Sequence, residues 1–113
     1  MQTAMVVTWT HPIPGREAKA LEYAAEVARF WGKQAAEGLC SEPEMFFSDR
    51  GTSMWIVKGE RDVVLRIHDM DEARLLTLKG ELLLEEFNVD FFYTGDAAAD
   101  YMVRFNSALT SIS

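Results

Sequence analysis

Positive charge, cysteine and long hydrophobic runs are all scarce in this chain of 113 residues, and each scarcity excludes a class of protein. Eleven Lys and Arg against 18 Asp and Glu give a formal net charge of −7, which argues against nucleic acid or a membrane surface as a partner. Cys40, the single cysteine, cannot form an internal disulfide, so we expect a cytoplasmic protein. No apolar run approaches the ~18–20 residues that cross a bilayer.

The amino acids that are present have the composition of a globular domain. Hydrophobic residues make up 49% and charged residues 26%, which is too apolar for a disordered chain. Neither repeats nor a linker interrupt the sequence. We therefore expect a single domain over residues 1–113, with a core at 4–94 and a short carboxyl-terminal helix at about 97–109.

The first half of the chain changes from a strand pattern to a helix pattern. Residues 4–10 are β-branched, aromatic or apolar, and the loop at 12–15 contains two prolines and a glycine that cannot continue a ladder. From 16 to 37 the apolar residues recur every three or four positions, which predicts a long amphipathic helix. Gly38 is expected to end it in a left-handed conformation.

The second half repeats this order after a hairpin. Apolar runs at 45–48 and 53–58 flank a short turn containing glycine, which is typical of a β-hairpin. Residues 62–86 are helical in two pieces, and we expect Asp71 to cap the second piece. Gly80 lowers helix propensity by ~1 kcal/mol, so a break there is possible.

A strand at 87–94 completes the core, and Gly95 or Asp96 is expected to lie near the start of the last helix. The resulting order of strand, helix, two strands, helix and strand is the ferredoxin-like βαββαβ pattern. We expect an α+β fold with a four-stranded antiparallel sheet and both main helices on one face.

The first and third strands carry apolar residues on both faces, which a sheet covered by helices on one side does not need, whereas the last strand alternates. Met5 and Val7 point one way and Ala4 and Val6 the other, and residues 54–57 behave alike. Covering 500 Å² of such a surface is worth on the order of 12 kcal/mol before association costs. The pattern favours a homodimer packed through its sheet faces.

A second cover for that face exists within the chain. The last helix has apolar residues that could fold over the sheet as a lid, namely Tyr101, Met102, Phe105 and Leu109. In the dimer interpretation the same helix would instead cover part of the partner subunit.

This arrangement resembles the dimeric α/β-barrel superfamily over residues 4–94. Pro14-Gly15-Arg16-Glu17 is similar to the Pro-Gly-basic-Glu turn of its antibiotic-biosynthesis-monooxygenase-like branch, and Asp71-Glu72-Ala73-Arg74-Leu75-Leu76 resembles the start of the family's second helix. The resemblance implies two ferredoxin-like protomers that join their sheets into a barrel. Its members include cofactor-free monooxygenases, haem-degrading enzymes and lactone isomerases, so fold does not fix function.

The haem-degrading branch uses an Asn on the first strand, a Trp near the third strand and a His on the second helix. Trp55 and His68 are similar in place, but residues 4–10 contain no Asn, and Thr8 is the closest polar side chain. This departure disfavours haem degradation.

Two histidines are the candidate catalytic residues. His11 follows the first strand before a proline-rich loop, and His68 lies in the second helical region beside Asp69. Either imidazole could act as a general base near neutral pH. The alternative is that both are ordinary polar residues, bonded to backbone or water. Their spacing gives no metal motif, so we expect neither metal nor cofactor.

Aromatic residues are the candidate ligand contacts, above all Trp9, Trp55 and Tyr93, although aromatic core is the alternative for each. One hypothesis is a cofactor-independent monooxygenase or isomerase that acts on a small aromatic or quinone-like compound. The other is a non-catalytic binding or structural dimer. An open cavity of ~300 Å³ or more reached by a histidine would favour the enzyme. An interior filled by side chains would favour the non-catalytic dimer.

Overall fold

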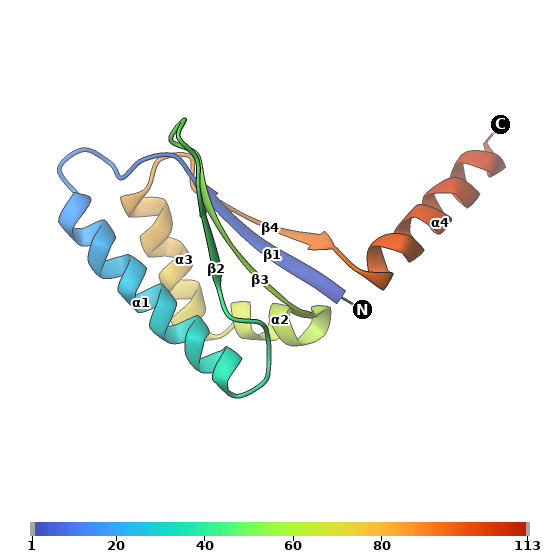
Figure 1. Ribbon diagram of the computed structural model, residues 1–113, viewed down its shortest axis with the longest axis horizontal. Helices are drawn as coiled ribbons and strands as arrows, with labels where there is room; N and C mark the ends of the chain where they lie inside the picture. Colours follow the sequence, from blue (N-terminus) through green and yellow to red (C-terminus); the bar gives the residue numbers. More distant parts are fainter. Residues whose placement is uncertain (1, 113) are drawn as a thin grey trace.

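The computed structural model describes residues 2–112, and the predicted α+β fold is confirmed (Figure 1). Four strands and four helices follow one another in the expected order. Their bounds are β1 Gln2–Trp9, α1 Glu17–Ala36, β2 Glu44–Phe47, β3 Ser53–Glu60, α2 Arg61–His68, α3 Asp71–Leu83, β4 Asn88–Tyr93 and α4 Asp96–Ser111.

The sheet is antiparallel throughout, with the strand order β2-β3-β1-β4 of a ferredoxin-like fold. In the central strand, Val7 pairs with Trp55 of β3 on one side and with Val89 of β4 on the other. Helices α1 and α3 pack together on one face of the sheet, and α2 connects that layer to β3 (Figure 1). No helix in residues 2–112 is long and apolar enough to span a membrane.

The hydrophobic core lies between these two layers because one side chain in two along each strand points toward the helices. Trp31 of α1 lies 5.9 Å from Trp55 of β3 between ring centroids, and Phe30 packs edge-on against Trp31 at 5.5 Å. Other core residues share nearly complete burial and come from every layer: Met5, Val7, Tyr23, Val27, Val57, Val64, Ile67, Ala73 and Leu76.

The helix starts show one wrong prediction. Asp71 does not cap α3, since Met70 occupies the N-cap position and no side chain there donates or accepts a capping hydrogen bond. Asp71 is instead the first helical residue, where its negative charge is stabilised by the positive end of the helix dipole. Gly38 follows α1 with φ of 78°, as expected for a left-handed helix end.

Gly80 does not break its helix. Helix α3 runs continuously from Asp71 to Leu83, and Gly80 is buried against the rings of Phe87 and Tyr23. A Cβ at this position would overlap the Phe87 ring and would lie 2.7 Å from the Tyr23 hydroxyl oxygen. The glycine therefore allows close packing between α3 and its neighbours.

Gly80→Ala is expected to lower the free energy of unfolding by about 1–3 kcal/mol, although alanine has the higher helix propensity, because the methyl group overpacks the contact. The matched control is Gly32→Ala in α1, where an added Cβ meets no atom within 4 Å. That variant should gain up to ~1 kcal/mol. Urea unfolding measures both, and a stabilised Gly80→Ala protein would contradict the packing argument.

Helix α4 does not act as a lid on its own sheet. It leaves the end of β4 and projects away from the layers (Figure 1), and of its residues only Ala97 is buried. The apolar residues expected to cover the sheet remain half or more exposed: Tyr101 at 50%, Met102 at 61%, Phe105 at 54% and Leu109 at 53%. The lid interpretation is therefore wrong for a single copy of the chain.

Candidate functional site

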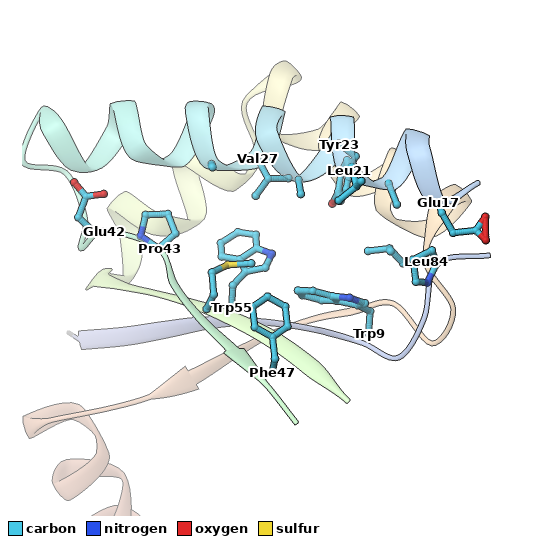
Figure 2. Close-up of a pocket in the computed structure, with 15 residues that line it drawn as sticks. Trp9, Glu17, Leu21, Tyr23, Val27, Glu42, Pro43, Phe47, Trp55 and Leu84 are labelled. Carbon is cyan, nitrogen blue, oxygen red and sulfur yellow. The ribbon is translucent and has the colours of Figure 1, made fainter. Parts of the chain in front are cut away.

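An apolar cleft of about 590 Å³ opens between α1 and the edge of the sheet formed by β2 and β3 (Figure 2). The rings of Trp9 and Trp55 lie on its sheet side, with Phe47 of β2 beside them. Trp55 is buried, whereas Phe47 is 72% exposed. The cleft is therefore closed toward the core and open toward solvent.

The sequence of α1 explains why space remains there. Ala20, Ala24 and Ala28 line the cleft at spacings of four residues, so small side chains follow one another on this side of the helix. Beyond them α1 carries Trp31, whose ring meets Trp55, and the interior is filled at that point. Small residues before a large one thus leave a cleft that ends at the tryptophan pair.

Few polar groups reach the cleft. Of the described residues that line it, the charged ones are Glu17 and Glu42, at opposite ends in Figure 2. Glu17 accepts a hydrogen bond of 3.3 Å from the backbone N–H of Gly15. Tyr23 also lines the cleft, and burial raises the pKa of its phenol, an effect that the nearby Glu26 carboxylate reinforces.

The structure brings together two of the three predicted aromatic contacts. Trp9 and Trp55 both line the cleft. Tyr93 lies instead on β4, where its ring stacks on Tyr101 of α4 at 5.2 Å and lies 5.2 Å from the guanidinium of Arg61. It therefore contacts the amino-terminal half of α4 and is not among the described lining residues.

His11 is exposed and lies outside the described lining of the cleft, although Trp9 and Pro12 belong to it. Its ring packs over Gly51 in the turn of the hairpin, and its backbone carbonyl accepts a 2.7 Å hydrogen bond from Glu85. Its imidazole thus covers the hairpin turn.

His68 is half-buried and packs edge-on against Phe91, with ring centroids 5.3 Å apart. It borders a hollow of about 10 Å³, which holds a single water at most. Burial lowers the pKa of His68 below its ordinary value, and the opposing effect of Asp69 does not cancel it. Its environment is that of a core-edge residue.

Neither the lone cysteine nor a cluster of metal-ligating side chains adds a reactive group to the cleft within residues 2–112. Cys40 is half-buried, and burial together with the Glu42 carboxylate raises the pKa of its thiol. Residues 2–112 contain no group of three or more His, Cys, Asp or Glu side chains placed to hold a metal ion.

Sequence reasoning missed most of the cleft lining. Glu17 and Glu42 are unremarkable surface acids in the sequence, and Leu21, which is 75% exposed at the mouth, belongs to no motif. The signal that could have found the site is the alanine series on α1, because three small residues on one helix face leave room beside a sheet rich in tryptophan.

The chain matches no protein-family model and no curated protein sequence. Solved structures with similar folds include SnoaB from Streptomyces nogalater, a cofactor-independent oxygenase, at 14% identity and a TM-score of 0.65. That match covers 82% of this chain and 92% of SnoaB.

Two further neighbours extend the comparison. A candidate antibiotic biosynthesis monooxygenase from Nitrosomonas europaea has 7% identity and a TM-score of 0.59, covering 80% of this chain and 88% of that one. A dimeric ferredoxin-like protein of unknown function from Bacteroides fragilis has 8% identity and a TM-score of 0.57, covering 80% and 94%. These similarities show the fold, which includes antibiotic-biosynthesis-monooxygenase-like proteins, and assign no specific function.

The depressed pKa of His68 makes a pH dependence testable. An unfolded histidine takes up its proton near pH 6.5, whereas folded His68 does so only at lower pH. Between these values the unfolded state binds more protons, so folding stability falls as the pH falls below about 6.5. Replacing His68 with Gln should make this acid-side fall shallower in urea unfolding at pH 5 and 7. His11→Gln is the control, and identical slopes for the parent and His68→Gln would contradict the assignment.

Proposed function

We propose that the protein binds a small planar aromatic or quinone-like molecule in the cleft. The observation that carries the proposal is an apolar space of about 590 Å³ with Trp9 and Trp55 on one side. Ligand sites typically span ~300–1,000 Å³ and combine apolar walls with a few polar groups. The cleft has this character, and its rings provide flat surfaces for stacking.

Catalysis as a cofactor-independent monooxygenase or isomerase is a second candidate, supported by the shared fold of SnoaB. Its proton carriers would be His11 or His68, or the groups that border the cleft, Glu17, Glu42 and Tyr23. The location of both histidines outside the described lining favours the binding role. Oxygen uptake with a hydroquinone, lost on filling the cleft, would distinguish the enzyme from the binder.

Filling the cleft should abolish binding without unfolding the protein. Ala24→Phe places a ring into the cleft from α1, whereas Ala25→Phe adds the same ring at an exposed position outside the lining. Menadione, a neutral methylated naphthoquinone, should quench tryptophan fluorescence in the parent and in Ala25→Phe. Its Kd should rise at least about tenfold in Ala24→Phe, a loss of ~1.4 kcal/mol. Equal affinities in all three proteins would exclude the cleft as the site.

We also propose that the protein forms a homodimer through the free face of its sheet. The register lines up Phe46 with Met54 on one row and Val6 with Ile56 on the next, all on the face away from the helices. Phe92 extends the same face on β4 and is 50% exposed. A second copy would bury this surface.

Helix α4 enlarges the surface that a second copy can cover. Its half-exposed apolar side chains, together with Phe46 and Phe92, each present on the order of 100 Å². The sum approaches the ~800 Å² that each partner buries in a typical stable interface. The dimeric state of the Bacteroides fragilis protein supports the same assembly.

A charge at the centre of the free face should prevent dimerisation. Ile56→Glu would leave a carboxylate inside the interface. The control Leu78→Glu changes an exposed residue of α3, which lies on the helix-covered side of the sheet, away from the proposed interface. Sedimentation at micromolar concentration should give twice 12.8 kDa for the parent and Leu78→Glu, and 12.8 kDa for Ile56→Glu. A parent that sediments as a single 12.8 kDa particle would overturn the dimer.

A further inference from the structure

We propose that the cleft selects cationic aromatic ligands and rejects anionic ones, an inference that rests on the proposed binding function. The residues 2–112 that line it include two carboxylates, Glu17 and Glu42, and no lysine, arginine or histidine. An anion entering the cleft would meet carboxylates with no compensating base. A cation would instead be attracted by the negative charge at the rim, where the two acids lie at opposite ends in Figure 2, with the Glu17 carboxylate turned outward toward the Gly15 backbone.

The base next to Glu17 in the sequence does not neutralise this charge at the cleft. Arg16 directs its guanidinium to the backbone carbonyl of Leu82, at the end of α3. Lys79, which also reaches toward α1, is engaged with Glu26 in an ion pair of 2.8 Å. Two bases on this side of the molecule are thus committed to other partners.

The aromatic walls favour the same ligand class. The faces of Trp9, Trp55 and Phe47 lie around the middle of the cleft (Figure 2). Indole and phenyl faces carry negative quadrupoles that attract a cation within ~6 Å, most strongly where water is excluded. An ammonium group joined to a flat ring can therefore gain from aromatic walls and carboxylate ends together.

The size of the preference for cations depends on how exposed the two glutamates are. Both glutamates are exposed, so each ion pair with a ligand is screened by water and contributes little by itself. The combined preference should be a moderate factor, and it should depend on salt because the Debye length shrinks from ~10 Å at 0.1 M to ~3 Å at 1 M.

Three naphthalene compounds of nearly equal shape provide the test: naphthylmethyl-trimethylammonium, naphthylmethanol and naphthoate. In calorimetric titrations at low salt, the cation should bind at least about threefold more tightly than the alcohol, and the carboxylate at least about tenfold more weakly than the cation. The double variant Glu17→Gln/Glu42→Gln should lose the salt-dependent part of the preference for the cation over the alcohol and keep only the part that the aromatic walls supply. The control Glu22→Gln/Glu72→Gln removes the same charge at exposed helix positions outside the lining and should keep the preference.

The outcomes separate the two proposals. If the alcohol binds, Ala24→Phe abolishes that binding and the cation binds no better, the charge selection is wrong while the binding function stands. If the control double variant loses the preference as fully as the cleft variant, the selection reflects net charge, and the inference is overturned. If none of the three compounds binds while menadione does, the charge selection is wrong and the binding function stands; if menadione does not bind either, the binding function itself is refuted.

Discussion

The position of α1 depends on one contact between large side chains. Trp31 meets Trp55 of the sheet, while Tyr23 packs toward Gly80 and holds α1 beside α3. These buried rings fix where the helix lies, and the alanines that precede Trp31 along the helix cannot fill the distance to β2 that results. The cleft is thus a consequence of core packing, since close-packed interiors leave space only where side chains are too small to reach.

Two apolar surfaces remain outside this core, and their shapes suit different occupants. The cleft is concave, with tryptophan walls and acidic ends, which suits a small molecule. The free sheet face and α4 form a broad surface with half-exposed aromatic residues, which suits a second copy. Each surface can be altered without touching the other because the sheet separates them.

The sequence predicted the fold well because the fold depends on local patterns. Periodicity, turn residues and strand alternation placed nearly every element, and the two-sided strands marked the free face before the register was known. Predictions at single residues fared differently. Met70, not Asp71, occupies the N-cap position of α3. Gly80 lies inside that helix with Phe87 and Tyr23 packed on it, contacts that no local pattern reveals.

The sequence by itself determined a small acidic α+β domain with a ferredoxin-like order of elements, because hydrophobic periodicity and charge are properties of neighbouring residues. Only the tertiary structure decided which residues share the cleft. Glu17, Glu42 and Trp55 come from three separate segments of the chain. His11 and His68 lie outside the lining, although the sequence made both of them candidates for the site. Chain folding brings distant side chains together, so the composition of a site depends on packing between elements that no spacing along the chain encodes.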